Sequence, residues 1–404
     1  MTSRERVLCA LDHREPDRVP IDFAAWRSSG VHAMAYGRLR RHLGLPDDGS
    51  WRLYDVMQQL AEPEEPVRQR FRGDVVQVHR LCPAFGIPID RWKPGVLADG
   101  QACQFPESYE PVRQADGTYR LFAEDGSEIA RMPADGGYFE ATAFPLAGAR
   151  TARDIEEADW PLIDATEVAF LRAQAERWRR ETDAAILVCF GGNVLEAGNF
   201  AFGFERFMSL LGESPELVEA YLERLTQWHL DNLEAFLPAV EGLVDIIAVG
   251  DDLGTQEATI LSPTMYRRVI KPRQARVYRR IRERSTARLF LHSCGAIEPL
   301  LGDLIEIGVE ALNPVQITAR GMDPAHLKRT YGRDLTLWGG GCDTQVALTT
   351  LPLPALREHV KGLVRTFKPG GGFVFTQVHN VLWNVAPERI EAVYDAAWEE
   401  GNAA

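Results

Sequence analysis

Short apolar runs recur along the chain, and stretches with the 3.6-residue period of a helix separate most of them. Strands that are apolar on both faces are typical of parallel sheets covered by helices on both sides. We predict eight such strands, over residues 19–24, 74–79, 185–190, 244–249, 287–294, 310–315, 335–338 and 371–377. Eight strands that alternate with helices predict the α/β class and a (β/α)8 TIM barrel. A doubly wound open sheet is the alternative, but no glycine-rich nucleotide-binding motif follows any of these strands.

Helix boundaries are marked most clearly in the second half of the chain. The pattern predicts helices over residues 215–240 and 264–284. The second has Pro263 in its first turn and Ser262 as its N-cap. Residues 54–61 are also predicted to be helical.

Residues 81–150 differ from the rest of the chain because Pro and Gly are frequent there. Two strand-like runs in this segment flank a turn at Asp125-Gly126, which indicates a β-hairpin. We therefore predict an insertion with a β-hairpin after the second strand. Residues 1–404 are predicted to form a single barrel domain, in which an N-terminal extension precedes the first strand.

Three residues suited to metal binding lie at strand ends. His292 and Cys294 are two positions apart at the end of one predicted strand, so their side chains project to the same side. Cys342 follows the strand over residues 335–338 and three glycines. One imidazole and two thiolates are a usual protein share of a zinc site that keeps its fourth position open. We predict that His292, Cys294 and Cys342 bind zinc; the alternative is two buried cysteines and a core histidine.

Other polar residues also follow the predicted strands, and the carboxyl ends of the strands form the active site of a (β/α)8 barrel. Candidates for catalysis are Asp252, Gln316 and His379, and candidates for substrate binding are Arg27, Asp74, Asn193, Glu196 and Asp251. Simpler roles stay open for some of them. Asp251 and Asp252 could cap a helix. His379 could be a core histidine bonded to a carbonyl group, and Arg27 could be a solvated surface residue.

The net charge and the cysteine content limit the kinds of binding partner and cellular compartment that we expect for this protein. The 404 residues carry a net charge of −13, which argues against nucleic acid and anionic membranes as partners. No apolar stretch is long enough to span a bilayer, and the charged start of the chain indicates no signal peptide. Six cysteines in a chain of this length do not indicate a disulfide framework, so we expect a cytoplasmic protein with free thiols.

Several motifs are distributed along nearly the whole chain: Thr2-Ser-Arg-Glu-Arg-Val, Glu15-Pro-Asp-Arg-Val-Pro, Gly250-Asp-Asp-Leu-Gly-Thr-Gln, Leu261-Ser-Pro-Thr-Met-Tyr, Leu291-His-Ser-Cys-Gly, Ala311-Leu-Asn-Pro-Val-Gln, Trp338-Gly-Gly-Gly-Cys-Asp-Thr and Val378-His-Asn. Together they resemble the motifs of the uroporphyrinogen decarboxylase-like superfamily, and within it those of the zinc-dependent corrinoid methyltransferases. The resemblance implies a (β/α)8 barrel. The methyltransferase branch also implies zinc at the His-x-Cys pair and the distant cysteine.

Two departures from the family pattern bear on the reaction. The decarboxylases carry closely spaced arginines after the first strand, which hold the several carboxylates of their substrate, whereas this chain has only Arg27 there. Some thiol-methylating members carry a glutamate after the sixth strand that can approach the zinc, whereas this chain has Gln316. Asp74 lies near the position at which the decarboxylases keep an essential aspartate.

The resemblance implies methyl transfer between a small methylated compound, of methyl ether, amine or thiol type, and the cobalt of a corrinoid. The chain has no Asp-x-His-x-x-Gly segment, so the corrinoid would arrive on a separate corrinoid-binding protein. Asp252, His379 or Gln316 would orient the substrate or move a proton. One alternative is a metal-independent lyase that decarboxylates a smaller acid with Asp74 and Arg27. Another is a barrel without catalysis that binds a metal or ligand. The number of subunits stays open, with a homodimer as one candidate.

Overall fold

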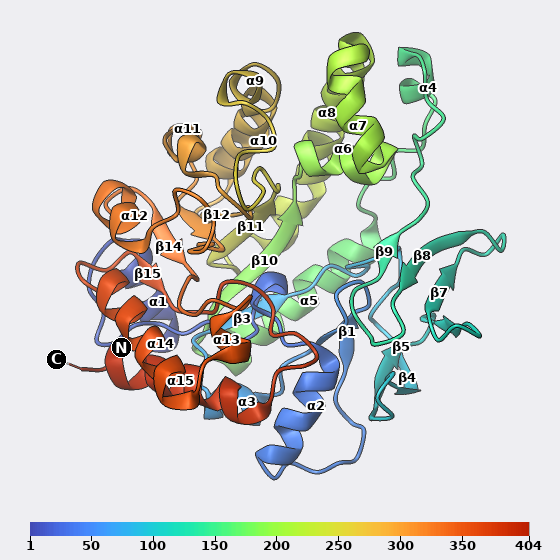
Figure 1. Cartoon of the computed structure of the whole chain (residues 1–404). Helices are drawn as coiled ribbons and strands as arrows, with labels where there is room; N and C mark the ends of the chain where they lie inside the picture. Colours follow the sequence, from blue (N-terminus) through green and yellow to red (C-terminus); the bar gives the residue numbers. More distant parts are fainter. Residues whose placement is uncertain (404) are drawn as a thin grey trace.

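The computed structural model describes residues 1–403, which form an α/β fold around a curled parallel sheet (Figure 1). Within this range the sheet has seven strands in the order β15-β14-β13-β12-β11-β10-β3, and every neighbouring pair is parallel. Their bounds are β3 Val75–Val78, β10 Ala185–Gly191, β11 Ile246–Gly250, β12 Arg288–His292, β13 Ala311–Asn313, β14 Thr336–Trp338 and β15 Phe373–Val374. The predicted α/β class is confirmed.

Where the sequence predicts a strand over residues 19–24, the structure has a single-residue bridge. Ile21 pairs in parallel with Phe375, directly after β15. The Ile21 carbonyl also accepts the backbone N–H of Asp74, directly before β3, at 2.7 Å. One segment thus contacts both edges of the curled sheet. A longer ladder is blocked at Pro20, which has no N–H to donate. Within the described residues the large parallel sheet therefore has seven strands and this bridge in place of the eight strands predicted.

Helices connect the strands and cover the sheet (Figure 1). Their bounds are α1 Ser3–Leu11, α2 Ala33–His42, α3 Glu65–Arg70, α4 Ala152–Glu156, α5 Ala165–Glu181, α6 Leu195–Phe202, α7 Phe204–Glu213, α8 Pro215–Val240, α9 Pro263–Val269, α10 Lys271–Arg284, α11 Leu301–Glu306, α12 Pro324–Tyr331, α13 Ala347–Thr350, α14 Leu353–Phe367 and α15 Pro387–Gly401, with single 3-10 turns at η1 Arg27–Ser29 and η2 Glu298–Leu300. None of the helices in the described part of the chain combines the length and the apolar character needed to cross a membrane.

Two of the predicted helices can be compared directly with the structure. The helix predicted over residues 215–240 is confirmed as α8. The helix predicted over residues 264–284 is divided at Ile270 into α9 and α10. Ser262 caps α9 as predicted, because its hydroxyl accepts the backbone N–H of Met265 at 3.2 Å.

The prediction of a helix over residues 54–61 is wrong. Two short strands, β1 Leu53–Asp55 and β2 Leu60–Ala61, pair in antiparallel orientation there. The carboxylate of Asp55 accepts the backbone N–H groups of Met57 and Gln58, each at 2.9 Å. Such side-chain bonds to the backbone compete with helix formation, so the apolar spacing of this segment reflects a turn between two strands.

Residues 92–141 form two small antiparallel sheets between β3 and α5. The first pairs β4 Trp92–Val96 with β5 Ala102–Pro106. The second has the order β6-β7-β8-β9, with the bounds β6 Val112–Arg113, β7 Tyr119–Phe122, β8 Glu128–Met132 and β9 Glu140–Ala141. Between β7 and β8 the chain turns at Asp125, whose carboxylate accepts the Ser127 N–H at 2.9 Å, and at Gly126, which has a φ of 82°. In Figure 1 these strands lie at one side of the large sheet.

The interior of the curled sheet is filled by residues at alternate strand positions, among them Leu187 of β10 and Ala248 of β11. Phe290 of β12 lies at the centre of this cluster. Its ring packs edge-to-face against Trp338 of β14, with centroids 5.2 Å apart, and against Trp26 at 5.6 Å. Trp26 also lines a cavity at the carboxyl ends of the strands, so its ring, which packs against Phe290, forms part of the wall of the candidate site.

Candidate functional site

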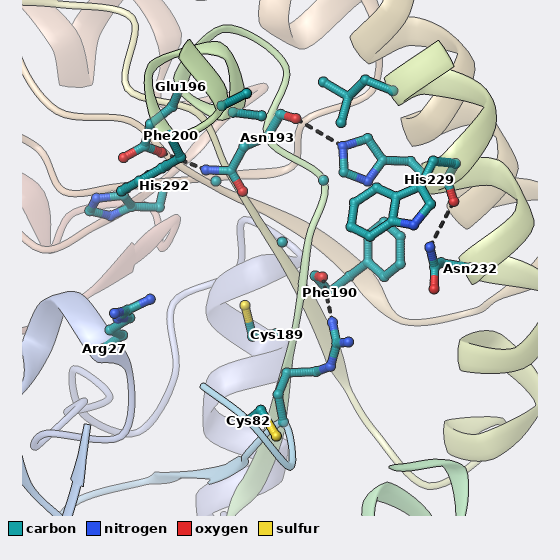
Figure 2. A pocket seen from close by; sticks show the side chains of 18 of the residues that line it. Arg27, Cys82, Cys189, Phe190, Asn193, Glu196, Phe200, His229, Asn232 and His292 are labelled. Carbon is teal, nitrogen blue, oxygen red and sulfur yellow. Dashed lines mark hydrogen bonds between the residues drawn. The ribbon is translucent and has the colours of Figure 1, made fainter. Parts of the chain in front are cut away.

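A cavity of about 850 Å³ opens at the carboxyl ends of the parallel strands, where a barrel of this class holds its active site. Its walls come from the ends of β10, β11 and β12, from η1, and from helices α6 and α8. One end carries polar residues, including Glu196, Asp252 and His292. The other end is more apolar, with the ring of Phe190 (Figure 2), and Trp228 also lines the cavity. The cavity therefore has a reactive end and an apolar end.

Three potential metal ligands meet at the reactive end. Candidate donor atoms of His292, Cys294 and His379 all lie within 4.8 Å of one another. The Sγ atom of Cys294 is 3.6 Å from Nε2 of His292, and the two imidazole rings are 5.8 Å apart between centroids. His292 ends β12, Cys294 follows it, and His379 lies in the loop after β15. A sulfur and two imidazole nitrogens are donors that zinc prefers, so the residues present fit a zinc ion.

The structure places His379, and not the predicted Cys342, beside His292 and Cys294. Cys342 is fully buried and, among the described residues, stands outside the group formed by His292, Cys294 and His379. Its thiol donates a hydrogen bond to the carbonyl of Asp343, at 3.5 Å. The chain turns after β14 through Gly339 and Gly340, which have φ values of 102° and 74°. This turn directs the cysteine into the hydrophobic core, and His379 occupies the third corner of the group.

Asp252 supports the same group from the end of β11. Its carboxylate accepts the backbone N–H of Cys294 at 2.8 Å and lies 3.6 Å from Nε2 of His292. Asp252 also lines the cavity. A second carboxylate, Glu196, lines the same end of the cavity and accepts a hydrogen bond from the side-chain amide of Asn193 (Figure 2).

Asp251 has a different role from its neighbour Asp252. Its side chain is fully buried, and its carboxylate accepts the backbone N–H groups of Val194, Leu195 and Glu196 at 3.1, 3.0 and 2.8 Å. These groups form the first turn of α6, so Asp251 caps that helix from an adjacent strand. Asp251 does not line the cavity in the described structure, so the predicted contact with substrate is not seen. Its bond to the backbone N–H of Glu196 positions that residue instead.

The remaining candidates, Arg27, Gln316 and Asp74, lie in three different parts of the structure. Arg27 lines the cavity from η1, with its Nε atom 2.6 Å from the carboxylate of Asp55. Gln316 is outside the cavity lining; its carbonyl oxygen accepts the N–H of Gly295 at 2.7 Å, and its amide donates to Gln256 at 2.7 Å. It therefore holds the loop that follows Cys294.

Asp74 lies at the opposite end of the sheet, before the first residue of β3. Its carboxylate is fully buried and forms ion pairs with Arg6 at 2.7 Å and Arg18 at 2.6 Å. It also accepts the backbone N–H of Ile21 at 2.9 Å. The predicted contact with substrate is thus replaced by a structural role, because both oxygens of this carboxylate accept hydrogen bonds from within the protein.

Burial affects the protonation of His379, Cys294 and Glu196. It lowers the pKa of His379 to about 4, with a further contribution from His292, so this imidazole is neutral at pH 7 and has a lone pair for a metal. Burial and the carboxylate of Asp252 raise the pKa of the Cys294 thiol well above its usual range. Burial and the carboxylates of Asp252 and Asp251 likewise raise the pKa of Glu196. A metal ion would displace the thiol proton of Cys294 as it binds.

Sequence reasoning missed two residues in contact with this group. Asn313 ends β13, the strand beside β12, and its side-chain oxygen is 3.0 Å from Nδ1 of His292. Ser28, in η1, donates its hydroxyl to the same oxygen. Asn313 lies within the sixth predicted strand, over residues 310–315, and precedes the predicted candidate Gln316 by three residues. Ser28 has no comparable signal, because only the closed fold brings η1 against β13.

The family model described as Uroporphyrinogen decarboxylase (URO-D) matches residues 145–399, more than half of the 404-residue chain. The protein belongs to the uroporphyrinogen decarboxylase family, and the superfamily resemblance of the sequence is confirmed. Among solved structures, a methyltransferase from Methanosarcina mazei is similar over 99% of both chains, with 17% identity and a TM-score of 0.58. This likeness shows a common fold. A B12-independent methionine synthase from Shewanella sp. W3-18-1 matches over 83% of both chains, with 10% identity and a TM-score of 0.37. No curated protein matches the chain.

Proposed function

We propose that this protein is a zinc-dependent methyltransferase that moves a methyl group between a small methylated compound and the cobalt of a corrinoid. The observation that carries the proposal is the convergence of His292, Cys294 and His379 beside the cavity, with their donor atoms within 4.8 Å of one another. The methyltransferase from Methanosarcina mazei has the same fold, which is consistent with this function.

The donor set supports zinc as the metal. Zinc in catalytic sites is held by three protein ligands and keeps one position for water or substrate. His292 and His379 both line the cavity, so the remaining position would face the space available to a substrate. When bound there, zinc would act as a Lewis acid on the heteroatom that carries the methyl group. In this proposal His379 is the third ligand instead of Cys342, because Cys342 faces the core.

The carboxylates of the site would handle the proton of the reaction. When the methyl group leaves, the bond between carbon and heteroatom breaks, and the heteroatom keeps the electron pair and takes up a proton. Glu196 lines the cavity and has a raised pKa, so it can hold a proton near neutral pH and supply it to the heteroatom. Asp252 would keep Cys294 in place through its bond to the backbone N–H.

The apolar end of the cavity would bind the rest of the substrate. Phe190 lies at this end, Phe200, Leu162 and Trp228 also line the cavity, and a volume of about 850 Å³ lies within the usual range for ligand pockets. The proposal places the corrinoid on a separate protein, since the sequence contains no Asp-x-His-x-x-Gly corrinoid-binding segment. That partner would approach the open carboxyl end of the sheet.

Metal analysis and a methyl-transfer assay test the proposal together. We expect about one zinc per chain, as three ligands and one open position require. We also expect methylcobalamin to form from cob(I)alamin when the protein is supplied with aryl or alkyl methyl ethers, methylamines or methyl thioethers. A chelator should abolish the activity, and added zinc should restore it. A protein that binds no zinc, or whose activity survives chelation, would contradict the proposal.

A metal-independent carboxy-lyase is the second candidate, because the matching family model is that of uroporphyrinogen decarboxylase. Its predicted residues were Arg27 and Asp74. Arg27 lines the cavity, but Asp74 is buried at the other end of the sheet and is paired with two arginines. The second candidate would be favoured if the chelated protein released carbon dioxide from small carboxylic acids.

A further inference from the structure

The side-chain amide of Asn313 is fully buried and can adopt only one of its two orientations. Its Nδ2 atom lies 3.1 Å from the carbonyl oxygen of Trp338, which can only accept a hydrogen bond. The amide must therefore direct its NH2 group to this carbonyl. With the amide reversed, two acceptor oxygens would face each other without a proton between them. The Oδ1 atom is consequently directed toward Ser28 and His292.

This orientation determines which ring nitrogen of His292 carries the proton. Asn313 Oδ1 lies 3.0 Å from His292 Nδ1 and has no hydrogen to give, so Nδ1 must be the donor. A neutral imidazole with its proton on Nδ1 has a free lone pair on Nε2. That Nε2 atom is the one that lies 3.6 Å from the sulfur of Cys294.

The sheet register explains why the contact is rigid. His292 and Asn313 are paired residues on the parallel strands β12 and β13, and the N–H of Ser293 donates to the Asn313 carbonyl at 2.7 Å. Ser28 supplies the second hydrogen bond to Oδ1 from η1. The backbone of β13 and the hydroxyl of Ser28 in η1 thus fix the position of the Asn313 amide oxygen, and this oxygen contacts the imidazole of His292 on β12.

We infer that Asn313, supported by Ser28, is a positioning residue that keeps His292 in the Nδ1–H tautomer and aims Nε2 at the metal. The inference rests on the proposed function for the identity of the ligand at Nε2, whereas the tautomer follows from the hydrogen bonds alone. Residues that orient a metal-binding histidine in this way commonly change metal affinity by about 10- to 100-fold when they are replaced.

Two substitutions of Asn313 separate orientation from packing. In Asn313→Leu the acceptor is lost, and we expect zinc to bind about 10- to 100-fold more weakly in competition with a chelator. In Asn313→Asp an acceptor oxygen remains for Nδ1–H, although the second oxygen now faces the Trp338 carbonyl and should lower the stability of the protein. The zinc affinity of the folded Asn313→Asp protein should therefore stay within a few-fold of wild type. Gln59→Leu is the matched control, because Gln59 is also a buried side-chain amide, its partners are Val56 and Tyr109, and it does not line the cavity. Its zinc affinity should equal that of wild type. Equal zinc affinity in Asn313→Leu and wild type would overturn the inference while leaving the proposed function intact.

A measurement on the wild-type protein keeps the test decisive if the variants do not fold. In metal-free protein with 15N-labelled histidine, the resonances of His292, assigned by their loss in His292→Gln, should show a proton on Nδ1 and a bare Nε2. A proton on Nε2 would overturn the inference. If wild type bound no zinc but showed the Nδ1–H tautomer, the proposed function would fail and the role of Asn313 in fixing the tautomer would stand.

Discussion

The Sγ atom of Cys294 lies 3.6 Å from Nε2 of His292, although the backbone turns sharply directly after the cysteine. Residues two apart at the end of a strand share a side, which brings the two donors together. The turn depends on Gly295, which has a φ of 92°, and a Cβ atom there would lie 2.3 Å from the carbonyl carbon of Gly254. The sequence His-Ser-Cys-Gly therefore encodes both the proximity of the two candidate donors and the close approach of the neighbouring loop.

The third ligand is tested by comparing two residues. We expect His379→Ala to lose zinc or to bind it much more weakly, because it removes one of the three donors that converge. Cys342→Ala should keep zinc, since its thiol donates to the Asp343 carbonyl within the core. The zinc content of each variant is measured after dialysis against a weak chelator. Zinc retained in His379→Ala and lost in Cys342→Ala would restore the ligand set predicted from the sequence.

Glu196→Gln should lower turnover while leaving zinc in place. The amide keeps the size of the side chain but cannot supply a proton, and general acid catalysis typically contributes about 10²- to 10⁴-fold. The rate of methyl transfer and the zinc content per chain would be measured on the same sample. Glu205→Gln, in the exposed first turn of α7, is the control. Unchanged turnover in Glu196→Gln would exclude this residue as the proton donor.

Asp251→Ala should destabilise the protein and disturb the cavity. Three backbone N–H groups at the start of α6 lose their acceptor, and leaving even one buried donor unsatisfied costs about 1–3 kcal/mol. Urea unfolding monitored by circular dichroism gives the change in the free energy of unfolding. Turnover should also fall, because Glu196 is one of the capped residues. Wild-type stability would show that the cap contributes nothing.

Asp74→Ala tests whether this residue acts on substrate or on folding. Removing one partner of a buried ion pair leaves uncompensated charge, and the typical cost is about 3–5 kcal/mol. Arg6 and Arg18 would both lose their partner, so we expect a large loss in the free energy of unfolding. The fraction that remains folded should bind zinc as wild type does. Full stability together with lost activity would return Asp74 to the substrate site.

Acid should weaken the protein partly through Asp17. Arg6 holds the pKa of the Asp17 carboxyl well below its usual range, with bonds of 2.7 and 2.9 Å to the two oxygens. A depressed folded-state pKa contributes stability above the unfolded pKa, about 3.9, and loses it as the pH falls through the folded value. The difference in free energy of unfolding between wild type and Asp17→Asn should therefore shrink as the pH falls below about 4. Asp47→Asn, at an exposed position, is the control. A difference independent of pH would contradict this role.

The pattern of apolar and polar residues along the chain was sufficient to predict much of the fold. The apolar runs predicted every strand of the large sheet, because strands buried on both faces need apolar residues at consecutive positions. It failed over residues 54–61, where the side chain of Asp55 bonds to the backbone and favours a turn. It also overestimated the strand at residues 19–24, where Pro20 and the sheet edges allow only a bridge.

The sequence by itself determined that the side chains of His292 and Cys294 lie on the same side of the strand, because two-residue spacing in a strand is a local property of the backbone. The tertiary structure decided the rest of the site. Cys342 and His379 both follow strands, and only the glycine turn after β14 shows that the cysteine faces the core while the histidine joins the pair. The contact of His292 with Asn313 depends on the register of two strands, which the residues of either strand alone do not specify.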